Sequence, residues 1–129
     1  MVLVDTSVWV DYFNGVDSRQ TNILDALLYS ELVAVGDLIL AEVLQGFRSE
    51  KDFNKARDYL EHLPFYLLGG HDVAVASAKN FRILRKKGIT IRKTIDVLIA
   101  TAAIYYDFEL LHNDRDFDAM KSIGLKVKL

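Results

Sequence analysis

The chain begins with a short, unbroken run of apolar residues, Val2-Leu3-Val4, which is followed by Asp-Thr-Ser. A run this short and this rich in β-branched residues is typical of a buried strand in a parallel sheet. Four later segments have a similar character and are predicted to form strands: residues 33–35, 65–68, 109–111 and 125–127.

The segments between these strands repeat apolar residues every three or four positions, which is the spacing of an amphipathic helix. The pattern predicts helices near residues 8–14, 19–30, 38–47, 49–63, 72–87 and 94–106, and a short one that ends at Ser122. We expect Thr6 or Ser7 to cap the first helix and Asp37 to cap the third. Strands that alternate with helices predict an α/β fold, with a mainly parallel sheet flanked by helices on both faces, in a single domain over residues 1–129.

The composition narrows the possible chemistry. Of the 129 residues, 51% are hydrophobic and 26% are charged, which is the profile of a soluble globular protein. There is no cysteine, so thiolate zinc sites, disulfides and cysteine nucleophiles are excluded. The chain has neither a long apolar run nor a basic leader segment, and we therefore expect a cytoplasmic protein without membrane association.

The net charge of -2 argues against a protein that coats nucleic acid by general electrostatics. Between Lys79 and Lys93, however, there are seven basic residues and no acidic one. The simpler interpretation is a solvated helix face, with cations favoured near the helix C-terminus. Because Arg92 and Lys93 come just before Asp96, and Arg115 follows Asp114, the alternative is that these three residues contact phosphates of a nucleic acid.

Four acidic residues occur at positions where the hydrophobic pattern of the predicted helices and strands does not require an acid: Asp5, Glu42, Asp96 and Asp114. Each has an ordinary explanation, as a turn residue, a helix surface residue, a first-turn acid or part of an Asx turn. A parallel sheet, however, would bring two strand ends and two flanking helices toward one edge.

Carboxylates gathered in this way raise one another's pKa values, and a bound cation removes that cost. Oxygen ligands without thiolate or histidine suit Mg²⁺ or Mn²⁺ better than zinc. Hydrolysis of phosphodiester bonds is a reaction that uses such a centre.

Four segments of the sequence resemble the PIN-domain family, and within it the VapC toxins of prokaryotic toxin–antitoxin pairs. The resemblance covers nearly the whole chain and rests on the order and spacing of these segments: Val-Leu-Val-Asp-Thr-Ser-Val-Trp, Leu-Ala-Glu-Val-Leu-Gln-Gly, Thr-Ile-Asp-Val-Leu-Ile-Ala-Thr-Ala-Ala and Leu-Leu-His-Asn-Asp-Arg-Asp-Phe.

The resemblance implies a role for individual residues. It makes Asp5, Glu42, Asp96 and Asp114 the catalytic acids that bind metal, with Asp116 as an auxiliary acid. It also implies that the hydroxyl groups of Thr6 or Ser7 assist near the metal and the substrate. One departure is His112-Asn113 before Asp114, where the family often has a threonine and then a variable residue. We expect His112 to be structural, the alternative being a contact with the scissile phosphate.

The resemblance further implies the biological activity. A chain of this type would be a Mg²⁺- or Mn²⁺-dependent endoribonuclease that cleaves RNA and inhibits translation. It would be neutralised by a cognate VapB-type antitoxin and would form a homodimer. It would contact promoter DNA only indirectly, through the antitoxin.

Three other functions are compatible with parts of the sequence. A phosphatase with Asp5 as nucleophile usually has a second aspartate two residues later, whereas position 7 is serine. A flap nuclease needs extra acids and a helical arch, for which this chain is too short. A non-catalytic RNA- or protein-binding PIN-like module usually lacks one of the four acids. All four are present, which favours the enzyme.

Overall fold

The computed structural model describes all residues from 1 to 129. Four parallel strands form one sheet in the order β3-β2-β1-β4. Their bounds are β1 (Val2–Val4), β2 (Val33–Gly36), β3 (Phe65–Tyr66) and β4 (Glu109–Leu111). The two inner strands are buried along their whole length, as expected for a parallel sheet that is covered on both faces.

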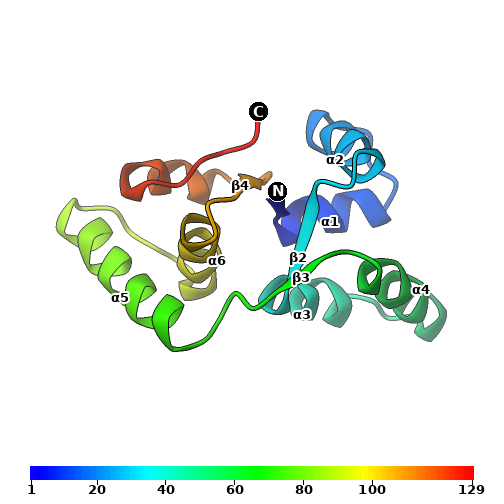
Figure 1. Ribbon diagram of the computed structural model, residues 1–129, viewed down its shortest axis with the longest axis horizontal. Helices are drawn as coiled ribbons and strands as arrows, with labels where there is room; N and C mark the ends of the chain where they lie inside the picture. The colour runs from blue at the N-terminus through cyan, green and yellow to red at the C-terminus, as the bar shows by residue number, and fades with distance from the viewer.

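Seven helices surround the sheet. They are α1 (Thr6–Phe13), α2 (Arg19–Tyr29), α3 (Asp37–Gln45), α4 (Glu50–Glu61), α5 (His71–Lys86), α6 (Thr94–Tyr105) and the 3₁₀ helix η1 (Arg115–Ile123). Figure 1 views the sheet nearly edge-on, with α5, α6 and η1 on its left and α1, α2 and α4 on its right. The predicted fold class, a parallel α/β sheet with helices on both faces, is confirmed.

The core forms between the sheet and the helices. Trp9 is completely buried and stacks on the half-buried Phe13. Small residues of α6, Ala100 and Ala103, are also fully buried, so this helix packs closely against its neighbours. None of the helices combines the length and the apolar character needed to cross a bilayer.

Several predicted boundaries were wrong, and the reason in each case is a side-chain contact. Helix α1 begins at Thr6, because the carboxylate of Asp5 accepts the first-turn hydrogen bond and acts as its cap. Asp37 does not cap α3, where Gly36 is the cap residue. The Oδ1 atom of Asp37 instead accepts a hydrogen bond from the backbone N–H of Leu68 at 2.6 Å.

Two predicted strands are shorter than expected. β3 ends at Tyr66 rather than at residue 68, because the backbone N–H of Leu68 is taken by Asp37. The expected strand over residues 125–127 is reduced to a single parallel bridge, between Leu110 and Val127.

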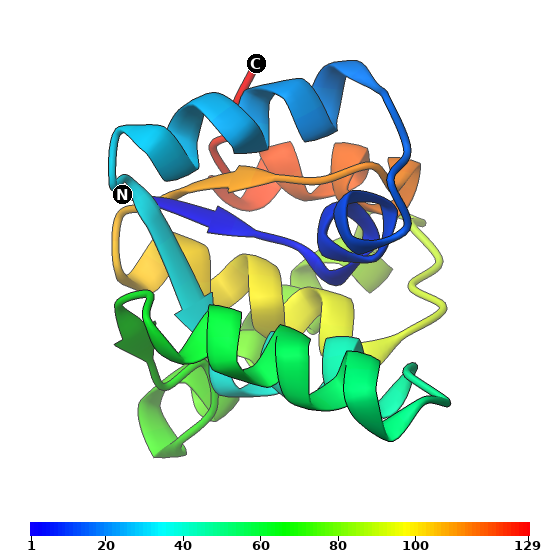
Figure 2. The ribbon, with the colours of Figure 1, turned by 90° about the vertical axis from the view of Figure 1, so that its right-hand side faces the viewer.

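The carboxyl ends of the strands lie at one edge of the sheet. All four strands are parallel. Figure 2 shows β1 and β4 pointing in the same direction, and α6 begins at the side to which they point. The backbone N–H of Asp5 donates to the carbonyl of Leu111 at 2.9 Å, so the ends of β1 and β4 are side by side. Asp5, the start of α6 and the segment after β4 therefore meet at this edge.

Candidate metal centre

Asp5 is held rigidly at the end of β1. The residue is 5% exposed, and its Oδ2 accepts hydrogen bonds from the Ser7 backbone N–H at 3.0 Å and from the Ser7 hydroxyl at 2.6 Å. The Ser7 hydroxyl in turn accepts a hydrogen bond from the backbone N–H of Asn113 at 3.0 Å. Ser7 thus joins the ends of β1 and β4 and fixes the orientation of the Asp5 carboxylate.

Glu42 reaches the same edge from α3. The hydroxyl of Thr6 donates to Glu42 Oε1 at 2.8 Å, which holds this longer side chain toward the first turn of α1. Both hydroxyl groups that follow Asp5 are therefore engaged with carboxylates of the candidate centre, Thr6 with Glu42 and Ser7 with Asp5.

Asp96 carries the strongest electrostatic perturbation among these acids. It lies in the first turn of α6, is 6% exposed, and its buried Oδ2 has no hydrogen-bond partner. Burial raises the pKa of Asp96 to about 6, and the negative charge of Asp5 adds to the effect, while Lys93 opposes it. Smaller contributions in the raising direction come from Asp114 and Glu42. The charges of the other three predicted acids thus all act on Asp96.

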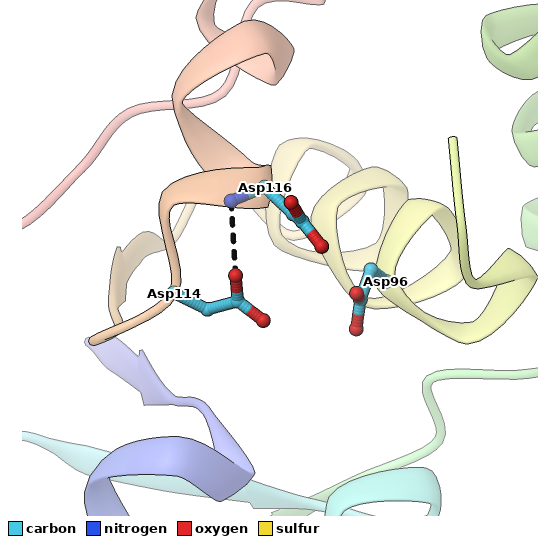
Figure 3. Close-up of side chains that lie close together, drawn as sticks. All are labelled: Asp96, Asp114 and Asp116. Carbon is cyan, nitrogen blue, oxygen red and sulfur yellow. Dashed lines mark hydrogen bonds between the residues drawn. The ribbon is translucent and has the colours of Figure 1, made fainter. Parts of the chain in front are cut away.

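Asp114 and Asp116 complete the acidic cluster. Asp114 caps η1, and its Oδ1 accepts a hydrogen bond from the backbone N–H of Asp116 at 2.9 Å. Figure 3 shows both side chains and that of Asp96 directed toward a common space. One carboxylate oxygen from each of the three lies within 4.8 Å of the other two. Asp116, expected only as an auxiliary acid, thus lies close enough to Asp96 and Asp114 for the three to share an ion.

The basic residues near the cluster are those at the end of the cationic run. Arg92 Nη2 donates to both carboxylate oxygens of Asp116, at 2.8 and 2.9 Å, and this contact lowers the pKa of the Asp116 carboxyl. Arg92 and Arg115 line a pocket of about 250 Å³ together with Asp96 and Asp116. The side chains of α5 that carry the earlier cations of the run are exposed, which fits a solvated helix face.

His112 is engaged by the turn that precedes Asp114. Its Nδ1 accepts a hydrogen bond from the backbone N–H of Asp114 at 3.2 Å, while its Nε2 is buried without a partner. The ring packs on Phe117 with centroids 5.0 Å apart, and burial lowers the pKa of His112. An imidazole that accepts through Nδ1 is neutral and carries its proton on Nε2. This arrangement gives His112 a role in shaping the turn before Asp114.

The sequence did not indicate one residue of the centre, Asn113. Its backbone N–H anchors Ser7, and its side-chain Nδ2 donates to Asp11 Oδ2 at 3.2 Å. These contacts join positions more than 100 residues apart, and the first is made by the backbone, so no pattern of residue types predicts them.

The donor atoms fit a hard divalent cation. All available ligands are carboxylate oxygens, which is the donor set that Mg²⁺ and Mn²⁺ prefer. A buried carboxylate oxygen without a partner, such as Asp96 Oδ2, carries a cost that a cation would remove. The residues present are therefore suited to holding such an ion.

Comparison with known proteins identifies the family. A PIN-domain family model matches residues 2–123. Ribonuclease VapC11 of Mycobacterium tuberculosis is 31% identical over 125 residues, which cover 95% of this chain and 93% of the relative. This chain belongs to the VapC ribonuclease toxins of the PIN-domain family.

Solved structures of VapC relatives share the fold. The crystal structure of VapBC2 from Rickettsia felis, bound to a DNA fragment from its promoter, includes a chain that matches with a TM-score of 0.78 and 23% identity. That match covers 99% of this chain and 98% of the other. VapC20 of Mycobacterium tuberculosis, a sarcin-ricin loop cleaving toxin, matches with a TM-score of 0.68 and 15% identity, covering 97% and 96% of the two chains.

Proposed function

We propose that this VapC-type ribonuclease hydrolyses phosphodiester bonds of RNA with Mg²⁺ or Mn²⁺ held by Asp5, Glu42, Asp96 and Asp114. The observation that carries the proposal is the buried, unpartnered Oδ2 of Asp96. The pKa of this carboxylate is raised chiefly by burial and further by the charges of the other three acids. Such an arrangement is costly without a cation and favourable with one. An ion held by these four acids would lower the pKa of a water bound to it and would stabilise charge on the phosphate oxygens.

The chain's own side chains position these acids and receive the substrate. Thr6 and Ser7 hold Glu42 and Asp5 by hydrogen bonds and act as positioning residues. Arg92 and Arg115 line the pocket, and the charge of Lys93 acts on Asp96. These three cations bind RNA phosphates and offset the repulsion between the backbone of RNA and the acidic centre.

We further propose that cleavage inhibits translation and that a VapB-type antitoxin neutralises the chain. Two adjoining pockets share Phe13 and Phe47 in their linings, the first with Val10 and the second with Tyr59. They offer a surface for an antitoxin segment. The solved complex of R. felis VapBC2 is bound to a DNA fragment from its promoter, and that of FitAB is bound to an IR36 DNA fragment. As the family resemblance implies, we propose that the chain forms a homodimer and contacts promoter DNA through its antitoxin.

Cleavage of a mixed cellular RNA pool by the purified, antitoxin-free chain tests the proposed reaction. With Mn²⁺ or Mg²⁺ we expect discrete fragments that disappear in EDTA and with Asp114→Asn. The matched control is Asp118→Asn, because Asp118 is an exposed acid of the same helix and lies outside the cluster. Equal cleavage by Asp114→Asn and Asp118→Asn would refute the proposed centre. Retained RNA binding in EDTA without any cleavage in metal would favour the non-catalytic module.

Replacing Thr6 with valine is expected to reduce cleavage about tenfold. The variant keeps the β-branched shape but removes the donor to Glu42 Oε1, and a hydrogen bond to a charged group contributes about 1.5 kcal/mol or more. The measurement is the ratio kcat/KM on a defined RNA fragment. Thr6→Ser restores the hydroxyl and should restore most of the activity. Equal rates for valine and serine would show that Thr6 does not position Glu42.

A further inference from the structure

The guanidinium of Arg92 holds the carboxylate of Asp116 by both of its oxygens. A single nitrogen, Nη2, makes the two contacts, at 2.8 and 2.9 Å. The Asp116 side chain is 25% exposed and the Arg92 side chain 67% exposed, so the pair spans from the edge of the acidic cluster to solvent. Because both partners are charged, this contact is stronger than an ordinary hydrogen bond. Asp116 is therefore already paired with a cation that the chain itself supplies.

Asp116 is also the one acid of this group that the proposed ion, held by Asp5, Glu42, Asp96 and Asp114, leaves unused. One oxygen of Asp116 lies within 4.8 Å of oxygens of Asp96 and Asp114. Centres with two metal ions place them about 3.5–4 Å apart and share carboxylates between them. A second ion in this cluster would share Asp96 or Asp114 with the first and would need the oxygens of Asp116. The guanidinium of Arg92 competes for those same oxygens.

We propose that Arg92 takes the place of a second cation, so that each active site binds one divalent ion. The inference rests on the proposed metal-dependent function and specifies the number of ions and the role of Arg92. The Asp116 contact uses only Nη2, so Nε and Nη1 are available to donate to phosphate oxygens of RNA. Arg92 lines the same pocket as Asp96, which places this positive charge beside the bound ion and in reach of the substrate. Asp116 is thus a positioning residue for Arg92.

Titration of the metal-free, full-length chain with Mn²⁺ tests this role without any measurement of activity. Isothermal titration, with free Mn²⁺ followed in parallel by electron paramagnetic resonance, gives the number of ions bound per chain. We expect one ion for the wild type and two for Arg92→Gln, in which Asp116 is released. The matched control is Arg115→Gln. It removes the same charge from the same pocket but breaks no ion pair, and should still bind one ion.

A double variant tests whether the second ion depends on Asp116. Adding Asp116→Asn to Arg92→Gln should return the number of ions to one. Two ions in the wild type, or one ion in both the wild type and Arg92→Gln, would overturn the inference without contradicting the proposed metal centre. No Mn²⁺ bound by the wild type at millimolar concentration would instead refute the proposed centre, and the inference with it.

Discussion

Replacing Asp96 with asparagine is expected to abolish RNA cleavage and, in the same protein, to stabilise the metal-free fold at neutral pH. Burial, together with the charge of Asp5, raises the pKa of Asp96 from 3.8 to about 6. The folded chain therefore binds the Asp96 proton more tightly than the unfolded chain does. The stability linked to this proton is fully present below pH 3.8 and is lost as the pH rises through about 6.

A pKa shift from 3.8 to about 6 corresponds to about 3 kcal/mol in the free energy of unfolding, between the protonated and the ionised form of Asp96. At pH 7.5 in EDTA, we expect Asp96→Asn to raise the free energy of unfolding by about 2 to 3 kcal/mol, because the buried charge is gone. At pH 4 the wild type is itself largely protonated at Asp96, so the two proteins should be about equally stable. Urea unfolding at both pH values measures the difference. An Asp96→Asn variant less stable than the wild type at pH 7.5 would contradict this electrostatic account.

Replacing Trp9 with alanine is expected to destabilise the fold by about 3 kcal/mol. Trp9 is fully buried and stacks on Phe13 with ring centroids 5.7 Å apart, and removal of a buried aromatic side chain costs about 3–5 kcal/mol. We expect the lower end of that range, because the indole N–H of Trp9 is buried without a partner and its removal relieves a desolvation cost.

The matched control for Trp9 is Tyr29→Ala. Tyr29 is also an aromatic residue on a helix of the N-terminal part, but it is 93% exposed, so its replacement should change stability by less than about 0.5 kcal/mol. The measurement is the midpoint of urea unfolding. Similar midpoints for the two variants would mean that α1 is not anchored by Trp9. Asp5, Thr6 and Ser7 lie at the start of α1. If Trp9→Ala loosens this helix, the variant should also bind Mn²⁺ more weakly.

The positions of the acids could be predicted from the sequence because they depend on topology. Asp5 and Asp114 follow short apolar segments, and strands of a parallel sheet end at one edge. Asp96 was placed near them because it lies in the first turn of a helix whose apolar and small residues pack against the sheet. These inferences need only the order of elements, which hydrophobic periodicity indicates well.

The contacts that orient these acids could not be predicted. The bond from Asn113 to Ser7 and the pair between Arg92 and Asp116 join residues 106 and 24 positions apart. Neither contact leaves a periodic signal in the sequence. The same applies to the ends of the helices, where the carboxylate of Asp5 rather than a hydroxyl of Thr6 or Ser7 caps α1. Capping and ion pairing depend on side-chain geometry that residue types alone leave open.

A crystal of the chain soaked in Mn²⁺, with data collected at the manganese absorption edge, tests the central claim most directly. The account predicts an anomalous peak between Asp96 and Asp114, within about 2.0–2.3 Å of a carboxylate oxygen from each, and absent from crystals of Asp96→Asn. A wild-type crystal that shows no peak among the acids, from protein that still cleaves RNA, would contradict the claim that these carboxylates hold the ion.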